Sequence, residues 1–159
     1  GLGVEYCSAA LYNADQTIAT ITHEFLTATP TPSPQRTFPL TNPLTNTIHT
    51  HLWQQEYCQF CFLTANPVRP TDQHVTILAC SVWDDQGALG DLWLQRPPGS
   101  TFDESEIRLV QQVANQCAIA LRQSRLFQAA QTQVSELERL SHLKDDFLST
   151  ISHELRTPM

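Results

Sequence analysis

The chain has 159 residues, a net charge of −7 and a sequence pI of about 5.2. Its hydrophobic fraction of 41% is too high for a disordered chain, and its acidity argues against a nucleic-acid-binding protein. No window approaches the roughly 18 uncharged apolar residues of a membrane-spanning helix, and residues 1–25 lack the pattern of a signal peptide.

The charges divide the chain into two parts. Residues 1–120 carry 11 acids and 4 bases, whereas residues 121–159 carry 5 of each. This shift predicts a compact acidic domain followed by a helical extension.

The N-terminal third predicts a hairpin, a loop and a short helix. Residues 3–12 and 16–25 are apolar, β-branched runs separated by turn-forming residues, which indicates two paired strands. Five prolines in residues 28–43 predict a loop without regular structure. Apolar residues at four-residue spacing then predict a helix over 44–55.

A second hairpin is the clearest expected element of the middle region. Residues 57–63 predict a strand, and a proline-containing loop follows at 66–72. Residues 74–83 and 88–95 are rich in large apolar groups, and the Asp-Asp-Gln-Gly between them offers Gly87 for a tight turn. At least one face of this sheet should therefore be buried.

One long helix is expected to follow. Asp103 can cap it, and Glu106 can reach back to the capping residue. There is no glycine or proline from residue 100 to residue 157, so a helix over most of that span would be roughly 80 Å long.

The apolar stripe of this helix changes face part-way along. The first stripe comprises Ile107, Val110, Ala114, Cys117 and Leu121. The second comprises Leu126, Ala130, Leu137, Leu140, Phe147 and Ile151, with polar Gln133 and Lys144 in the same series. We expect the first to pack on the domain's own sheet and the second to form a coiled coil with the same helix of a second chain, giving a homodimer. The alternative is an amphipathic helix that folds back on its own domain.

Residues 147–158 place a histidine on the polar side of this helix. His153 lies about 200° around the helix from Ile151 and should project into solvent. A neutral imidazole there is nucleophilic, and Glu154 could accept the proton of one ring nitrogen. Taken alone, such a residue is most often an ordinary solvated histidine.

The segment resembles the phosphoacceptor box of sensor histidine kinases, F-x-x-x-x-S-H-E-L-R-T-P, and every specified position is present. The resemblance implies that His153 takes the γ-phosphoryl group of ATP and passes it to an aspartate of a response regulator. It implies that Glu154 assists the proton transfer, and that Thr157 positions water when such proteins act as phosphatases. Residues 122–142 would then be a coiled-coil signalling helix, and residues 143–159 the start of the dimerisation and phosphoacceptor domain.

The five glycines form no phosphate-binding loop, so we do not expect these residues by themselves to bind ATP or to be an enzyme. By the resemblance, ATP and Mg²⁺ would be bound by an ATP-binding domain of a longer parent kinase.

Residues 87–128 resemble the end of a GAF domain, with its G-x-x-G strand, acidic helix start and A-I-A-L run. The resemblance implies an α+β fold, an antiparallel sheet with helices and a ligand pocket, over residues 1–121. The usual first helix of the family is expected to be missing before Gly1.

The ligand of such a domain is not evident from the sequence. Bilin-binding GAF domains attach their pigment to a cysteine usually followed by histidine. Here the five cysteines are followed by Ser8, Gln59, Phe62, Ser81 and Ala118. We therefore do not expect a covalent bilin.

The cysteines are interpreted as reduced, buried thiols of a cytoplasmic protein, because no secretion signal accompanies them. Cys58 and Cys61 form a C-x-x-C pair, but an odd spacing on a strand points the two thiols to opposite faces. Such a pair also supplies only two of four zinc ligands. We therefore expect no metal site.

The remaining candidates are read as structural, with His49 and His51 expected on the surface and Trp53, Trp83 and Trp93 in the core. Two functions compete with a kinase sensor. They are a ligand-free GAF dimerisation module, and a redox or metal sensor that uses Cys58 and Cys61.

Overall fold

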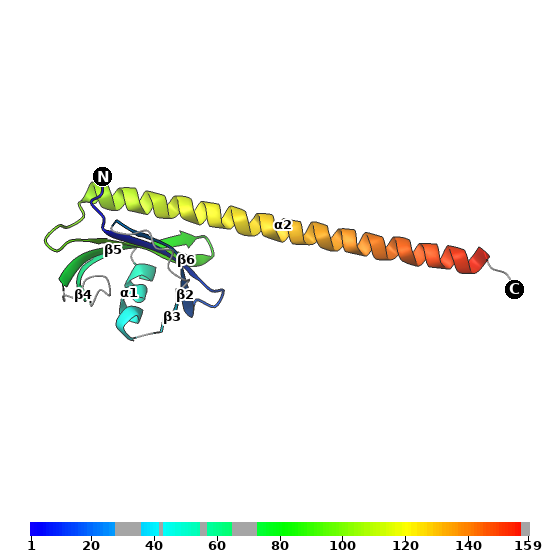
Figure 1. Ribbon diagram of the computed structural model, residues 1–159, viewed down its shortest axis with the longest axis horizontal. Helices are drawn as coiled ribbons and strands as arrows, with labels where there is room; N and C mark the ends of the chain where they lie inside the picture. The colour runs from blue at the N-terminus through cyan, green and yellow to red at the C-terminus, as the bar shows by residue number, and fades with distance from the viewer. Residues whose placement is uncertain (28–35, 42, 55–56, 65–72, 157–159) are drawn as a thin grey trace. The chain divides into compact units, whose positions relative to one another are not determined.

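The computed structural model describes residues 1–27, 36–41, 43–54, 57–64 and 73–156. The chain divides into two compact units, residues 1–119 and 120–159. The elements, shown in Figure 1, are β1 (Tyr6–Tyr12), β2 (Ile18–Leu26), β3 (Arg36–Pro39), α1 (Pro43–Gln54), β4 (Tyr57–Thr64), β5 (Gln73–Asp84), β6 (Gly87–Arg96) and α2 (Glu104–Arg156).

The six strands form one antiparallel sheet in the order β3-β2-β1-β6-β5-β4. The two hairpins and the strand over 57–63 are confirmed, and so is the α+β class. Since β1 pairs with β6, the N-terminal strand lies in the centre of the sheet.

Side-chain caps hold both hairpin turns. Oδ1 of Asn13 accepts hydrogen bonds from the backbone N–H of Thr17 and Ile18, at 2.9 and 2.8 Å. In the second hairpin, Oδ1 of Asp84 accepts from the N–H of Gln86 at 2.8 Å and of Gly87 at 3.1 Å. Gly87 has φ 135°, the conformation for which a glycine was expected there.

The loop expected over 28–43 is wrong in its second half, because residues 36–39 form β3. This strand pairs with β2 at the edge of the sheet, and Arg36 forms an ion pair with Glu24 of β2. An edge strand tolerates Pro39, whose missing N–H removes no bond from the interior of the sheet. Residues 40 and 41 form a turn, and α1 begins at Pro43. Residues 28–35 and 42 of that loop, and the loop expected over 66–72, lie outside the described residues.

Helices cover both faces of the sheet, with α1 on one face and the first turns of α2 on the other (Figure 1). Alternation along β6 assigns its side chains. Asp91 and Trp93 meet His49 of α1, while Arg96 meets Glu106 of α2, so Leu92 and Leu94 share the α2 face. On α2 itself the expected first stripe is confirmed, since Val110 and Ala114 are buried together with Ala118.

A reciprocal cap fixes the start of α2. The N–H of Glu106 donates to Oδ1 of Asp103, and the N–H of Asp103 donates to Oε2 of Glu106, both at 3.0 Å. These two bonds satisfy donors that a helix start leaves unpaired. From there α2 is one helix of 53 residues, as the absence of glycine and proline predicted.

The buried Arg96 joins the start of the chain to the start of α2. Its Nε donates to the carbonyl of Leu2 at 2.6 Å, and its Nη1 donates to the carbonyl of Thr101 at 3.2 Å. The guanidinium also forms a two-pronged ion pair with Glu106 and lies 4.0 Å from the ring centroid of Phe102. One side chain thus fastens three backbone segments.

Candidate sensory and phosphoacceptor sites

A group of three polar side chains, which we call the buried triad, lies beneath α1. It comprises Tyr12, His49 and Asp91, with exposed fractions of 5%, 0% and 0%. The hydroxyl of Tyr12 donates to Oδ2 of Asp91 at 2.5 Å, and Nε2 of His49 lies 3.3 Å from the same oxygen. Oδ1 of Asp91 is buried and has no hydrogen-bond partner among the residues described. An acceptor left in that state lowers the free energy of unfolding.

The expectation of a surface position for His49 is wrong. His49 and Leu52 are three residues apart on α1 and are both fully buried, whereas His51 is exposed as expected. The buried carboxyl group of Asp91 on β6 gives the imidazole a polar partner on that face. A single aspartate between Leu89 and Leu92 was the available sequence signal, because an acid in a buried strand needs a partner.

Aromatic rings surround the imidazole of His49. The ring centroids of Tyr12, Phe38, Trp53 and Trp93 lie 6.0–6.4 Å from its own. Trp53 and Trp93 are half-buried in this packing, in agreement with the expected core role. Trp83 is 39% exposed, so that expectation is wrong for the third tryptophan.

Burial, together with the adjacent Asp91, raises the pKa of Tyr12 far above the ordinary range of a phenol. The hydroxyl therefore remains a hydrogen-bond donor to Asp91 at any physiological pH.

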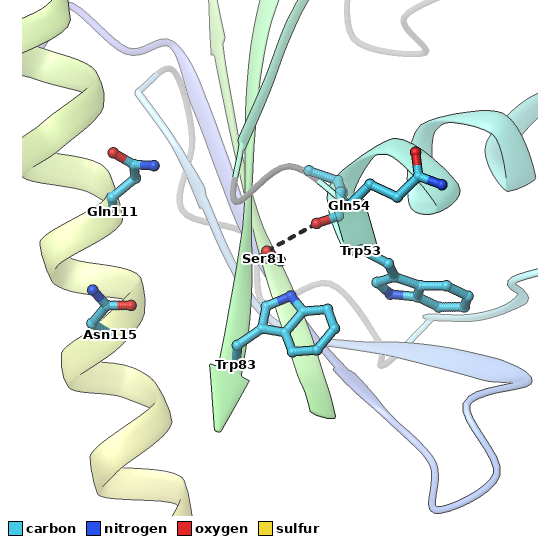
Figure 2. A pocket seen from close by; sticks show the side chains of 7 residues that line it. Trp53, Gln54, Ser81, Trp83, Gln111 and Asn115 are labelled. Carbon is cyan, nitrogen blue, oxygen red and sulfur yellow. Dashed lines mark hydrogen bonds between the residues drawn. The ribbon is translucent and has the colours of Figure 1, made fainter. Parts of the chain in front are cut away.

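A pocket of about 280 Å³ is lined in part by Trp53, whose ring packs against those of Tyr12 and His49. Figure 2 shows the residues that line it. Its lining residues are Leu52, Trp53, Gln54, Ser81, Trp83, Gln111 and Asn115. The carboxamides of Gln111 and Asn115 point from α2 towards β5, and the Trp83 indole lies between them and Trp53 (Figure 2). The hydroxyl of Ser81 donates to the carbonyl of Leu52 at 3.3 Å and so joins β5 to α1 at the pocket.

The two cysteines of the C-x-x-C pair lie on opposite faces of β4, as predicted. Cys58 is opposite Ala79 and Cys61 opposite Thr76, so alternation directs the first thiol to the α1 face and the second to the α2 face. All five cysteines are free. Cys80 is buried as expected, whereas Cys61 is exposed and the other three thiols are only half-buried, so the expected burial is wrong for Cys61 and only partly met by those three. Among the described residues no group of three metal-binding side chains is found.

His153 and Glu154 lie in the last turns of α2, and both are exposed. The third residue of the predicted phosphoacceptor site, Thr157, lies outside the described residues. The helix extends through Arg156, so the histidine is presented from a regular helix.

The second apolar stripe of α2 is exposed along its whole length in the single chain. Leu126, Leu137, Leu140, Phe147 and Ile151 have exposed fractions of 63%, 67%, 50%, 64% and 39%. A further row of exposed apolar side chains precedes the stripe and was not predicted from the sequence. Leu109, Val113 and Ile119 are 49%, 47% and 50% exposed. Leu109 precedes Leu137 by 28 residues and Ile119 precedes Leu126 by 7, so these two residues continue the register of the stripe, whereas Val113 lies one residue beside it.

The model of the GAF domain family matches residues 1–121. The chain belongs to the GAF domain family. The resemblance of residues 87–128 is thus confirmed over the whole first domain, and no curated protein matches the sequence significantly.

Solved structures share this fold at low sequence identity. The red-light-absorbing state of the red/green cyanobacteriochrome NpR6012g4 is 20% identical with a TM-score of 0.60, covering 80% of this chain and 88% of that one. Residues 122 to 287 of a methyl-accepting chemotaxis protein are 14% identical, with a TM-score of 0.60 and coverage of 79% and 82%. The GAF domain of a two-component sensor histidine kinase from Bacillus halodurans is 14% identical, with a TM-score of 0.58 and coverage of 78% and 85%.

The described helices include none that is both long and apolar enough to cross a lipid bilayer.

Proposed function

We propose that this chain is the sensory and signal-relay part of a two-component sensor histidine kinase. The GAF domain would receive the signal, and α2 would carry it to His153, which would be phosphorylated from ATP and would pass the phosphoryl group to a response-regulator aspartate. The observation that carries the proposal is the continuity of α2, which begins at a capped turn against the GAF sheet and reaches the S-H-E-L-R-T-P segment without a break.

The proposed chemistry needs an accessible imidazole and a group that takes its proton. A ring nitrogen of His153 attacks the γ-phosphorus, the bond to the β-phosphate oxygen breaks, and ADP leaves. Glu154 is the adjacent carboxylate on the helix and would accept the ring proton. ATP and Mg²⁺ would be held by the ATP-binding domain of the parent kinase, which would make that parent, and not these residues alone, the enzyme. Thr157 would orient water in a phosphatase reaction.

A homodimer through α2 is part of the proposal. The exposed stripe and the row at Leu109, Val113 and Ile119 would leave large apolar side chains in water in a single chain. A second copy offers the same stripe in the same register, which a two-fold axis brings together. A shift in the rotation of the paired helices would then change access to His153.

The test is phosphorylation of the protein that carries this segment together with its ATP-binding domain. With radiolabelled ATP, the unsubstituted protein is expected to gain acid-labile phosphate, and His153→Gln to gain none. His142→Gln is the matched control, since His142 is an exposed histidine of the same helix outside the motif. Labelling that survives His153→Gln would refute the assignment.

The competing functions make different predictions. A ligand-free dimerisation module predicts unchanged kinase activity when the pocket residues are replaced. A redox or metal sensor based on Cys58 and Cys61 is not favoured, because the two thiols face opposite sides of β4.

A further inference from the structure

The two outermost strands of the sheet differ in how they protect their unpaired backbone groups. β3 has only four residues, ends in Pro39 and carries the exposed, charged Arg36. Short length, proline and charge each oppose the addition of another strand. β4, at the opposite edge, has eight residues with neither proline nor charge among them, and no described strand pairs with its outer side.

β4 is also regular over its whole length. It pairs with β5 from Tyr57 to Thr64 without a shift in register, whereas the β1–β2 and β5–β6 pairs each contain one. A bulge bends a strand and interrupts further pairing. Without one, alternate residues of β4 direct their backbone N–H and C=O groups away from β5, in a row that another strand can match.

Side chains of β4 remain partly in contact with water. Phe60 packs edge-to-face on Trp93, with ring centroids 5.9 Å apart, yet it is only half-buried. Tyr57 and Cys61 are exposed. A strand added at this edge would cover part of that surface, which favours its addition.

The charge of the domain favours a second copy as the added strand. Residues 1–120 carry 11 acids and 4 bases, so a partner attracted by charge would be basic and would lose hydration at this uncharged edge. β4 has no charged residue, and in a pair of identical strands no like charges face each other. A copy of β4 therefore fits the edge without removing water from any charged group.

We propose that β4 is a self-association edge, at which two copies of this chain pair antiparallel about a two-fold axis and join their sheets. Opposite residues of an antiparallel pair point to the same face, so one residue must face its own copy. The central residues of β4 are Phe60 and Cys61, which pair residues 57–63 or 58–64 of the two copies. This contact is independent of the pairing proposed for α2, and a chain with two different two-fold contacts joins into assemblies larger than a dimer.

Sedimentation velocity tests the proposal on the whole chain carrying Leu137→Asp, which removes the α2 pairing, in the presence of a thiol reductant. We expect monomer at about 10 µM and a rising dimer fraction towards about 1 mM, because one strand pair buries less than the ~1,200 Å² of stable interfaces. Raising NaCl from about 0.1 M to about 0.5 M should strengthen association, since it screens the repulsion between two acidic domains. A chain that stays monomeric throughout, or that associates more weakly at higher salt, would overturn the proposal.

Cys61→Lys gives β4 the kind of charge that protects β3. In either register the two lysines would lie within about 8 Å of each other, so the dimer should weaken about tenfold or more at about 0.1 M salt. His23→Lys is the matched control, because it changes the net charge equally on an exposed residue of the inner strand β2 and should leave association unchanged. Equal association of the two variants would contradict the assignment to β4.

Hydrogen exchange gives a second measurement that needs no substitution in β4. As the concentration rises, amides of residues 57–64 that do not bond to β5 should gain protection, whereas those of β3 should not. Protection already present at the lowest concentration would show that the same chain covers the edge. Free exchange of these amides at every concentration would leave the edge to a strand of another protein, and either result would overturn the proposal.

Discussion

Tyr12→Phe removes a single hydroxyl from the buried triad, and its cost can be worked out from the contacts of Asp91. The lost hydrogen bond is 2.5 Å long and buried, and it joins β1 to β6. Hydrogen bonds to carboxylates contribute about 1.5–3 kcal/mol. Oδ1 of Asp91 already lacks a described partner, and His49 is 3.3 Å from Oδ2. We therefore expect a loss near the upper end, about 2–3 kcal/mol in the free energy of unfolding.

Urea denaturation followed by tryptophan fluorescence measures this loss, because all three tryptophans lie in the GAF domain. Tyr57→Phe is the matched control. Tyr57 is 39% exposed, so its substitution should change the free energy of unfolding by less than about 0.5 kcal/mol.

A double variant separates the hydrogen bond from general packing effects. Once Asp91→Leu has removed the carboxyl group, the Tyr12 hydroxyl has lost its acceptor, so Tyr12→Phe should cost about 1–2 kcal/mol less than in the unsubstituted chain. Effects that add to within about 0.5 kcal/mol would show that the two groups do not interact, and would refute the account of the triad.

Three further predictions concern the sheet, the thiols and α2. A Cβ at Gly90 would lie 2.1 Å from the carbonyl oxygen of Ala10, so Gly90→Ala should destabilise the domain by about 1–3 kcal/mol or more in the same urea assay, whereas an unchanged midpoint would contradict the close approach of β1 and β6. Burial raises the pKa of Cys80 to about 12 from 9.0, so the folded thiol keeps a proton that the unfolded thiol releases. The free energy of unfolding should therefore fall as the pH rises from about 9 to about 12, and it should fall less steeply in Cys80→Ala. Equal slopes in the two proteins would show that the thiol is accessible to water. Leu137→Asp places a charge in the exposed apolar stripe, so light scattering should show a monomer in place of a dimer, whereas Glu138→Gln should leave the dimer intact. If the unsubstituted chain is itself monomeric, the stripe does not form a dimer interface.

The elements with strong local signals were predictable from the sequence. The capping residues at 103 and 106 and the absence of glycine and proline defined α2, and Gly87 marked the second hairpin. Local propensity does not depend on which strands become neighbours, so these predictions needed no tertiary information.

The features that depend on pairing between distant segments were missed. β3 forms because β2 offers it an edge, and Pro39 within a proline-rich stretch of the sequence predicted a loop there. His49 is buried because Asp91, 42 residues later in the chain, lies opposite it. The exposed row at Leu109, Val113 and Ile119 was hidden in the sequence by the buried row beside it, since both are apolar and share the same turns of α2.

The contacts of Arg96 connect the N-terminal segment before β1 to the first turn of α2. The same guanidinium binds the carbonyl of Leu2 and the carboxylate of Glu106, which is itself half of the helix cap. Neither the lead-in to β1 nor the first turn of α2 can open without loosening the other. In hydrogen exchange the two segments should therefore open together with one free energy.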